Sequence, residues 1–496
     1  MKKIIFTLAA VGMLSACSLD ETPYGFYSSD NFYKTEEDAE SGLMYAYNAL
    51  NYLEYLRGIW YLGDIPTETM YPKSDEPGDI HMLQQWTVNS ETELTMYYFK
   101  YCYIGINRAN TVIDRVSGGN LNETVKNRVV GEALFLRAWN YFNLVRAYGR
   151  VPLYTEPIAS LDETTPQMAA VYRQDLRTDS GGSDRGRKDA HGKQGVRPHR
   201  QGRRAGPALE SLPDARVEHR LRRRPATPRR RAIADEMYTQ AAYWSRKVVF
   251  DYKETYNFDN DLRSIYDVTK PDGPEHIFIM GIDRSGTHEG MYSKIPLQFL
   301  PNNGSAPIYI RYSDGKPPEG QRQRLGRFPD RGQLRREDVS SPPDKRRTEL
   351  IHKDIYDQTG KLVTPSPVRG YFSAKYVDPD FIGERTSARP FLIRYSDIAL
   401  VFAEAADPDE GLALVNEIRR RAGIPDLPEG MSLAEFRKAV IQERTLELAF
   451  EGNRLYDLRR TASVTATVPE ATKLSEEQAA FYPIPQRELD LNPNVK

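Results

Sequence analysis

Apolar residues recur at helical spacing through the N-terminal part of the chain. The sequence TEED at residues 35–38 has the form of an N-cap followed by an acidic first turn, and apolar residues follow it at intervals of three and four. This spacing predicts helices over Glu36–Tyr55, Tyr97–Val116 and Val125–Tyr148. The third is apolar on most of its circumference and is followed by Gly149, which favours a buried helix with a glycine C-cap.

The same pattern returns towards the C-terminus. Helices are predicted over Phe391–Ala406, Glu410–Ala422 and Ser432–Gly452, the last opening with an S-x-x-E capping box at Ser432 and Glu435. Helices of about 15 to 20 residues joined by short turns are typical of tetratricopeptide-like hairpins, although the full consensus repeat is absent. The sequence therefore predicts a mainly α fold, a tetratricopeptide-like helical-repeat solenoid with long irregular loop insertions.

Two long stretches without helical period, Gly58–Asn89 and Pro271–Ile310, interrupt these helices. Loops carried on a rigid scaffold commonly hold the binding residues of a protein. We therefore expect the binding surface in these insertions.

The first residues have the three parts of a secretory signal. Two lysines precede the apolar run Ile4–Leu14, and the small residues Ser15 and Ala16 lead to Cys17. The sequence LSAC matches a bacterial lipobox, so we expect cleavage after residue 16 and diacylglycerol on Cys17, with an ordinary signal as the alternative. The second cysteine, Cys102, then has no intrachain partner, which excludes a structural disulfide.

Residues 173–231 depart from the rest of the chain. They hold 16 Arg and 2 Lys against 7 Asp plus Glu, and no aromatic residue occurs from 173 to 237. Single-stranded nucleic acid binders interleave aromatic residues with such charges, so nucleic acid is not expected as a partner. A local shift of reading frame is our preferred hypothesis and a disordered linker the alternative; residues 317–347 are similar. The expected organisation is a signal peptide at 1–16, an N-terminal helical region with binding loops at 17–172, this segment, and a C-terminal region at 232–496.

Six motifs together resemble one family, the SusD-like (SusD/RagB) outer-membrane nutrient-binding lipoproteins. They are FLIRYSDIALVFAEA from Phe391, VNEIRRRAG from Val415, ERTLELAFEGNRLYDLRR from Glu443, GEALFLRAWNYFNLVRAYGRVPL from Gly131, YIGINRANTVIDRV from Tyr103 and FYPIPQRELDLNPN from Phe481. The resemblance implies a lipid-anchored protein on the extracellular face of the outer membrane. Such a protein binds oligosaccharides or polysaccharide fragments and delivers them to a TonB-dependent (SusC-like) transporter, without a cofactor. Arg150 departs from the family, which usually has Gly or Asp there.

No motif for catalysis or metal binding occurs in the chain. It contains no H-E-x-x-H, G-x-S-x-G, P-loop, G-x-G-x-x-G or C-x-x-C, and no two of its 7 histidines have ligand spacing. We expect no catalytic residue, no metal and no cofactor. A lipid-anchored glycosidase stays open as an alternative, because glycoside hydrolysis needs only two carboxylates. A lipid-anchored helical-repeat scaffold for a protein or peptide partner is the other.

The C-terminal motif carries a stripe of like charges. Glu443, Glu447 and Glu451 stand at i, i+4 and i+8, a spacing that destabilises an isolated helix. Cations are therefore expected opposite them, from Arg394, Arg419, Arg454 and Arg459, as structural ion pairs between neighbouring hairpins.

Glycan contacts are expected from aromatic side chains in the insertions, because pyranose faces stack on Trp and Tyr while polar groups bind the hydroxyls. The candidates are Trp60, Tyr61, Tyr71, Trp86 and Asn89 in the first insertion and Tyr292 in the second. Ordinary packing is the alternative for each of them and is favoured for Trp60. Trp139 and Trp244, on predicted helices, are expected in the core. The sequence does not identify the sugar.

Overall fold

The computed structural model describes most of the chain outside its first residues and the arginine-rich segment. The described residues are 32–72, 76–158, 228–288, 290–301, 307–312, 319–322, 344–364, 366 and 370–495. The expected signal peptide, the expected lipidation of Cys17 and most of the segment 173–231 lie outside these residues. No helix within the described ranges is long and apolar enough to span a bilayer.

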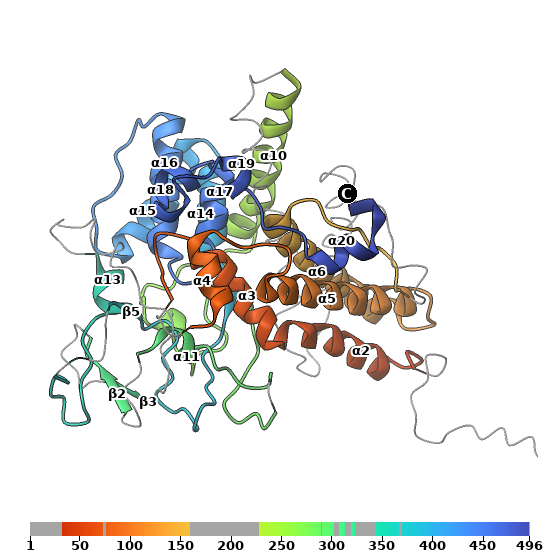
Figure 1. Ribbon diagram of the computed structural model, residues 1–496, viewed down its shortest axis with the longest axis horizontal. Helices are drawn as coiled ribbons and strands as arrows, with labels where there is room; N and C mark the ends of the chain where they lie inside the picture. Colours follow the sequence, from red (N-terminus) through yellow and green to blue (C-terminus); the bar gives the residue numbers. More distant parts are fainter. Residues whose placement is uncertain are drawn as a thin grey trace, which may run out of the picture.

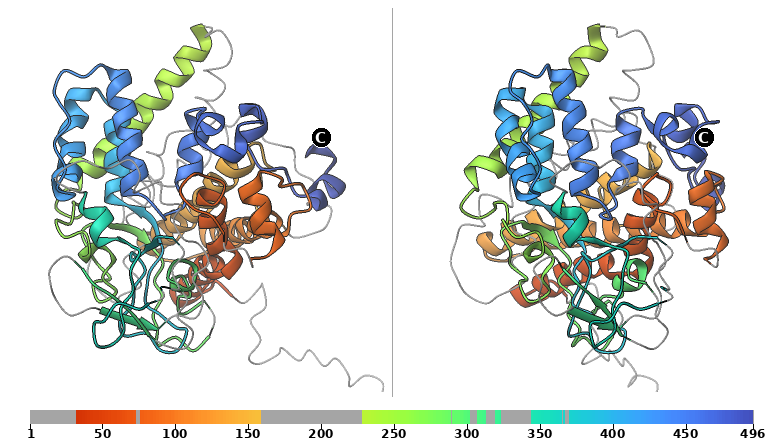
Figure 2. Two further views of the ribbon diagram at one scale, coloured as in Figure 1. Left: turned by 60° about the vertical axis from the view of Figure 1, so that its left-hand side comes forward. Right: turned by 90° about the vertical axis from the view of Figure 1, so that its left-hand side faces the viewer.

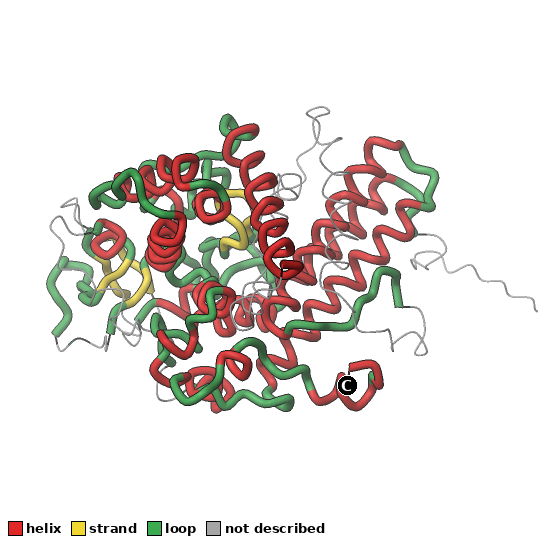
Figure 3. The backbone as a smooth tube through the Cα atoms, turned by 90° about the horizontal axis from the view of Figure 1, so that it is seen from above, coloured by secondary structure: helices red, strands yellow, loops and turns green. Residues whose placement is uncertain are grey.

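Helices dominate the N-terminal part, and the long ones lie side by side (Figures 1 and 3). They are α2 (Glu36–Asn48), η1 (Ala49–Asn51), α3 (Leu53–Asp64), α4 (Gly78–Gln85), α5 (Glu93–Ser117) and α6 (Glu123–Tyr148). The helices α5 and α6 form a hairpin, and α2 packs against both. The predicted N-cap at Thr35 is confirmed. It forms a full capping box, with the Thr35 side chain bonded to the Asp38 backbone and the Asp38 side chain to the Thr35 backbone.

Two expectations for this part are wrong. The predicted helix Glu36–Tyr55 is interrupted, because Tyr52 has an extended backbone (φ −61°, ψ 132°) that starts α3 in a new direction. The stretch Gly58–Asn89 is not irregular throughout, since α3 continues to Asp64 and α4 lies within it. Both helices are short and pack against α5, which supplies the stability that isolated helices of this length lack.

The middle of the chain forms an irregular insertion with short elements. The insertion follows the long helix α10 (Pro228–Arg246), and its elements are η4 (Lys247–Asp251), η5 (Ser264–Tyr266), β1 (His276–Ile279), α11 (Pro296–Phe299), β2 (Pro307–Ile310), β3 (Glu319–Arg322), α13 (Lys345–Glu349), β4 (Ile351–His352) and β5 (Phe372–Ser373). Three antiparallel pairs form among the described strands: β1 with β6 (Phe391–Arg394), β2 with β3, and β4 with β5. The predicted helix from Phe391 is therefore wrong in its first turn, because residues 391–394 pair with β1.

The C-terminal part returns to helices, the first of which stand next to α10 in Figure 2. They are α14 (Tyr395–Ala405), α15 (Pro408–Arg421), α16 (Leu433–Glu447), α17 (Arg454–Arg460), α18 (Val464–Thr467), η6 (Pro469–Ala471), α19 (Glu476–Ala479), α20 (Gln486–Leu491) and η7 (Pro493–Val495). The Ser432 capping box is confirmed. The predicted end at Gly452 is wrong: α16 stops at Glu447, and Phe450 and Gly452 have left-handed backbones (φ 64° and 77°).

One large hydrophobic core joins the two ends of the chain. Trp139 is confirmed as a core residue, with its ring edge-on to Phe278 of β1 at 5.5 Å between centroids. Trp244 is only half-buried, because α10 lies at the margin of the helical part and its Trp244 ring meets Tyr243 and the Lys247 ammonium. The prediction of a mainly α fold built from helix pairs with long irregular insertions is confirmed.

Candidate functional site

Trp86 is the candidate whose surroundings fit an accessible aromatic ring. It follows α4 as the C-cap with a left-handed backbone (φ 60°), an arrangement that costs a bulky residue about 1 kcal/mol or more. The indole N–H donates to the carbonyl oxygen of Pro66 at 3.0 Å, and one part of the ring packs against the core. The side chain is half-buried. An indole fixed at one edge and exposed at another can stack on a ligand with little loss of side-chain entropy.

Trp60 and Tyr61 do not lie on the surface. Both belong to helix α3 rather than to an irregular insertion, and their side chains are buried. The Trp60 ring meets Phe299 and Tyr376 edge-on, and the Tyr61 hydroxyl donates to Gln298. Both were predicted as glycan contacts because residues 58–89 were expected to be an irregular loop. That premise is wrong, because the two residues lie on α3, which directs both rings towards the insertion.

The other candidates remain accessible in part. Tyr71 is half-buried and Asn89 is exposed, but the Asn89 Oδ1 accepts the backbone N–H of Glu91 at 2.9 Å within the turn that leads into α5. Tyr292 is half-buried in the second insertion, with the Lys294 ammonium 5.8 Å from its ring centroid. Among the described residues, Trp86 and Tyr292 share no ring contact. Their role in binding stays a prediction.

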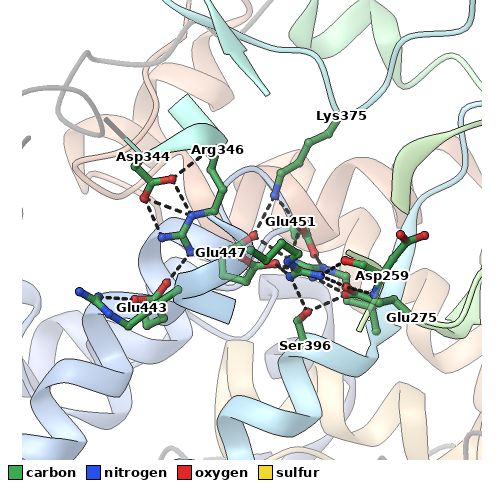
Figure 4. A network of polar contacts seen from close by, with 12 residues as sticks. Asp259, Glu275, Asp344, Arg346, Lys375, Ser396, Glu443, Glu447 and Glu451 are labelled. Atoms are coloured by element: carbon green, nitrogen blue, oxygen red, sulfur yellow. Dashed lines mark hydrogen bonds and ion pairs between the residues drawn. The ribbon is translucent and has the colours of Figure 1, made fainter. Parts of the chain in front are cut away.

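A buried network of ion pairs connects the irregular insertion to the C-terminal helices (Figure 4). We call it the central ion network. Within the described ranges its carboxylates are Glu275, Asp344, Glu443, Glu447 and Glu451, and its cations are Arg346, Lys375, Arg394, Arg419 and Arg421. Equal numbers of opposite charges make the network neutral as a whole, and all of these side chains except Arg419 are at most 3% exposed.

Glu447 is the carboxylate with the most cationic partners. Its Oε1 accepts Nη1 of Arg394 at 2.9 Å and Nη2 of Arg421 at 2.7 Å, and its Oε2 accepts Nη1 of Arg346 at 3.1 Å. Burial alone would raise the pKa of Glu447, but the three guanidinium groups together with Lys375 hold it far below the ordinary value of 4.5. The side chain is therefore ionised at neutral pH.

The neighbouring glutamate joins the network to the insertion. Glu451 accepts the Lys375 ammonium at 2.6 Å and the Arg394 Nε at 2.8 Å, and it also accepts the Tyr266 hydroxyl at 3.0 Å. Burial raises its pKa less than Arg394 and Lys375 lower it, so the pKa lies below its usual range. Lys375 follows β5 and Tyr266 lies in η5, so both carry the network into the insertion.

The sequence predicted ion pairs for this glutamate stripe, and the structure provides them with partly different partners. Arg394 and Arg419 contact the stripe as expected. Arg454 instead pairs with Glu68, which follows α3, at 2.5 Å. Arg459 is wrong as a partner of the stripe: its Nε donates to the carbonyl oxygen of Ala479 and its guanidinium covers the Tyr482 ring.

The turn after α16 forms a second joint, between the two ends of the chain. The Asp64 carboxylate accepts the backbone N–H of Gly452 at 2.8 Å and that of Arg454 at 3.3 Å. Any Cβ on Gly63 would collide with the Gly452 carbonyl group, and one on Gly452 would stand 2.5 Å from the carbonyl oxygen of Ile59. Glycine at both positions is what lets the backbones come this close.

Two features of the structure escaped the sequence reasoning. Arg346, Lys375, Glu275 and Arg421 complete the central ion network from distant parts of the chain. The only signal in the sequence was the glutamate stripe, which required cations opposite it but did not identify these residues. A row of tyrosines on α2 and α5 was missed because aromatic candidates were sought only outside helices. No group of three or more His, Cys, Asp or Glu suited to a metal ion occurs among the described residues.

Comparison with known proteins matches both ends of the chain. A model of the SusD family matches residues 354–496. A second model, described as starch-binding associating with outer membrane, matches residues 33–178. Together they span more than half of the chain, and none of the families or relatives quoted in this subsection is described as an enzyme.

Curated relatives and solved structures are similar to this chain along nearly its whole length. SusD-like protein P38 of Formosa agariphila is 25% identical over 99% of this chain and 96% of its own. A SusD homologue from Bacteroides thetaiotaomicron superposes with a TM-score of 0.73 at 20% identity, over 94% of this chain and 97% of that one. Surface glycan-binding protein A from the same species gives 0.70 at 17% identity, over 94% and 99%. With the motifs shared at both ends and the common fold, the chain belongs to the SusD-like family.

Proposed function

We propose that this protein is a cell-surface glycan-binding lipoprotein that captures oligosaccharides or polysaccharide fragments and delivers them to a partner TonB-dependent transporter. The observation that carries the proposal is membership of the SusD-like family over nearly the full length, including a fold shared with a surface glycan-binding protein. The description of the N-terminal family model, starch-binding and association with the outer membrane, supports glycan as ligand and the outer membrane as location.

The physical features of Trp86 support a role in stacking on the sugar. Its indole is held by the Pro66 carbonyl and by the core, so the exposed part of the ring is fixed before a ligand arrives. The left-handed backbone at this position is strained for tryptophan, and such strain is characteristic of functional sites. Tyr71 and Asn89, close to it in the sequence, supply a further ring and a polar side chain.

The proposal is tested with a tryptophan pair. Trp86→Ala should weaken binding to the cognate polysaccharide by about 1 to 3 kcal/mol, the order of one lost stacking contact. Trp244→Ala is the matched control, because Trp244 is also half-buried but lies on α10, outside the insertions. Affinity electrophoresis on gels containing amylopectin, laminarin, xylan or pectin measures the effect. Equal retention of both variants would remove Trp86 from the site, and a wild type that binds none of many polysaccharides would contradict the function.

Attachment to the membrane is proposed to occur through lipid on Cys17. The mature chain would then be held at one end only, with its binding loops free to face outwards. Cys17→Ser should move the protein from the membrane fraction to the soluble fraction and abolish metabolic labelling with a fatty acid. Labelling that persists in this variant would contradict lipidation at Cys17.

A further inference from the structure

A row of four tyrosines and one arginine runs across the face formed by α2, η1 and α5. We call it the tyrosine row; its members are Tyr45, Tyr52, Tyr97, Tyr101 and Arg108. Three of them, Tyr97, Tyr101 and Arg108, stand at i, i+4 and i+11 of helix α5, which brings them to one side of that helix. The other two come from α2 and from the residue that starts α3.

Each member of the row touches the next. The ring centroids of Tyr97 and Tyr101 are 6.5 Å apart, and those of Tyr101 and Tyr52 are 4.4 Å apart. The Arg108 guanidinium continues the row, 5.5 Å from the Tyr52 centroid and 3.7 Å from the Tyr45 centroid. Along α5 alone the row is about 16 Å long, from the rise of 1.5 Å per residue over eleven residues.

The row is held rigid from within. Arg108 donates from Nη1 to the carbonyl oxygen of Tyr45 at 3.0 Å and to Oδ1 of Asn48 at 3.4 Å, and from Nη2 to the Tyr52 hydroxyl at 2.9 Å. These bonds connect α2, α3 and α5. The rings therefore lose little freedom when something covers them, which lowers the entropic cost of binding.

The row is also accessible. Tyr45 is 58% exposed, and the other four members are half-buried rather than part of the core. Polar groups alternate with the rings, since Asn48 is exposed beside Arg108 and the Lys100 ammonium lies 5.4 Å from the Tyr101 centroid. A surface of rings separated by hydrogen-bonding groups suits the alternating apolar faces and hydroxyls of a sugar chain. It is less suited to an apolar helix, which asks for a continuous apolar patch.

The middle of the row lies next to the second insertion. Gly290 lies against Asn51 of η1, where a Cβ on the glycine would be 3.2 Å from the Asn51 Cβ. Asn51 directly precedes Tyr52, and Gly290 is two residues from the candidate Tyr292. The Tyr292 loop is fixed there by two backbone hydrogen bonds between Ser293 and Thr386, at 2.9 and 3.1 Å. The middle of the row, at Tyr52, is thus next to a loop expected to contact glycan.

We propose that the tyrosine row is a second glycan-binding surface, which takes an extended polysaccharide chain that also contacts the insertions. The inference rests on the proposed glycan-binding function and adds the class of ligand: a chain of many units rather than a short oligosaccharide. Pyranose faces stack on the rings of Tyr45 and Tyr101, and Lys100 and Asn48 donate to hydroxyl groups beside them. A short fragment contacts only the insertions.

The test compares long and short ligands. Tyr45→Ala/Tyr101→Ala should reduce affinity for the retaining polysaccharide in the gel panel by roughly fivefold or more, as expected for lost stacking. Affinity for its two- or three-unit fragments, measured by calorimetry, should stay within about twofold of the wild type. Tyr45→Phe/Tyr101→Phe keeps the rings and should behave as the wild type. Tyr243→Ala removes an exposed tyrosine of α10 and serves as the control.

The outcomes separate this inference from the proposed function. Equal polysaccharide affinity of the alanine pair and the wild type overturns the tyrosine row while the function stands. An equal loss for fragments and polysaccharide overturns the class of ligand. Unchanged glycan binding together with loss of a co-purifying membrane protein identifies the row as a protein-docking surface instead. A wild type that binds no polysaccharide overturns both proposals. Thermal unfolding of each variant excludes a misfolded chain. If the alanine pair fails to fold, the single variant Tyr45→Ala, at the most exposed member of the row, makes the same comparison of polysaccharide with fragments.

Discussion

Replacing Glu447 by glutamine tests whether the central ion network holds the insertion in place. The change keeps the size of the side chain but removes its charge, so three guanidinium groups, those of Arg346, Arg394 and Arg421, lose a shared carboxylate. At least one of these bonds cannot be replaced, because the glutamine Nε2 is itself a donor and would face an N–H group.

The expected cost follows from the burial of the site. Glu447 is 2% exposed, and its removal leaves one uncompensated positive charge in a network that is otherwise neutral. Removing one partner of a buried ion pair typically costs about 3 to 5 kcal/mol, because the remaining charge stays desolvated. The free energy of unfolding should therefore fall by about this amount at pH 7.

The assay is urea unfolding followed by circular dichroism, with a matched variant at the surface. Asp426→Asn makes the same carboxylate-to-amide change in the pair of Asp426 with Arg420, whose side chains are 44% and 62% exposed. That variant should lose less than about 1 kcal/mol. If Glu447→Gln lost no more than Asp426→Asn, the network would contribute nothing beyond an exposed pair, and the reasoning would be refuted.

The pH dependence gives a second check on the same variant. The pKa of Glu447 is lowered in the folded chain, below an ordinary value of 4.5. Its stabilisation is therefore fully present above about pH 4.5 and is lost as the pH falls towards the folded-state pKa. The difference between wild type and Glu447→Gln should shrink on acidification, whereas a constant difference would contradict the role of the charge.

Two further predictions concern the joint between the ends of the chain. Gly452→Ala should lower the free energy of unfolding by more than about 2 kcal/mol, because the backbone there is left-handed and the added Cβ would meet the Ile59 carbonyl. Gly430→Ala is the control in the same urea assay. Gly430 has a similar φ of 74° but open space around it, so the change should cost only about 1 kcal/mol. Burial, opposed by two backbone N–H groups, raises the pKa of Asp64 from 3.8 to about 7, so ionisation of Asp64 destabilises the folded chain progressively from about pH 4 to pH 7. Asp64→Asn cannot ionise, and wild type should lose up to about 4 kcal/mol relative to it over that window; parallel pH profiles would contradict the raised pKa.

The helices and caps that depend on local sequence were predictable. Helix α6 has a nearly continuous apolar surface, and the capping boxes at Thr35 and Ser432 satisfy backbone groups within four residues, so local pattern was enough. The errors in helix bounds arose where a segment pairs with a distant part of the chain. Residues from Phe391 have helical periodicity, but the strand β1, over 110 residues earlier in the chain, takes the first four of them into a sheet.

The partners of the glutamate stripe show the same limit. The like charges at Glu443, Glu447 and Glu451 indicated that cations had to face them, and this demand is local. Which cations pair with the stripe depends on the path of the insertion. It brings Arg346 to Glu443, 97 positions away in the sequence, and Lys375 to Glu451, 76 positions away. Trp60 was misplaced for a related reason, because the period of a short helix is too brief to identify its buried side.

Two exposed aromatic side chains lie close in the sequence to the arginine-rich segment 173–231. Helix α10 begins at the end of this segment, and its Tyr243 is 49% exposed, while Phe250 of η4 is 42% exposed. Aromatic side chains of this size are normally covered in a helical fold, and family resemblance calls for a further helix pair at this place. A shifted reading frame stays the prediction that explains both the composition and the exposed rings. Translation of the gene in the other two frames tests it, and the absence of amphipathic helices in both would rule it out.

The distribution of charge gives a physical reason for a binding role without chemistry at the central ion network. A catalytic carboxylate needs access to substrate and a pKa matched to proton transfer near neutral pH. Glu447 and Glu451 have neither, because both are buried and cations hold their pKa values low. Buried ion pairs add little net stability compared with apolar packing, but they tolerate few alternative arrangements. The network therefore fixes where β5, η5 and the preceding loops lie against the helices, and a surface that recognises a flexible sugar chain gains affinity from being fixed in advance.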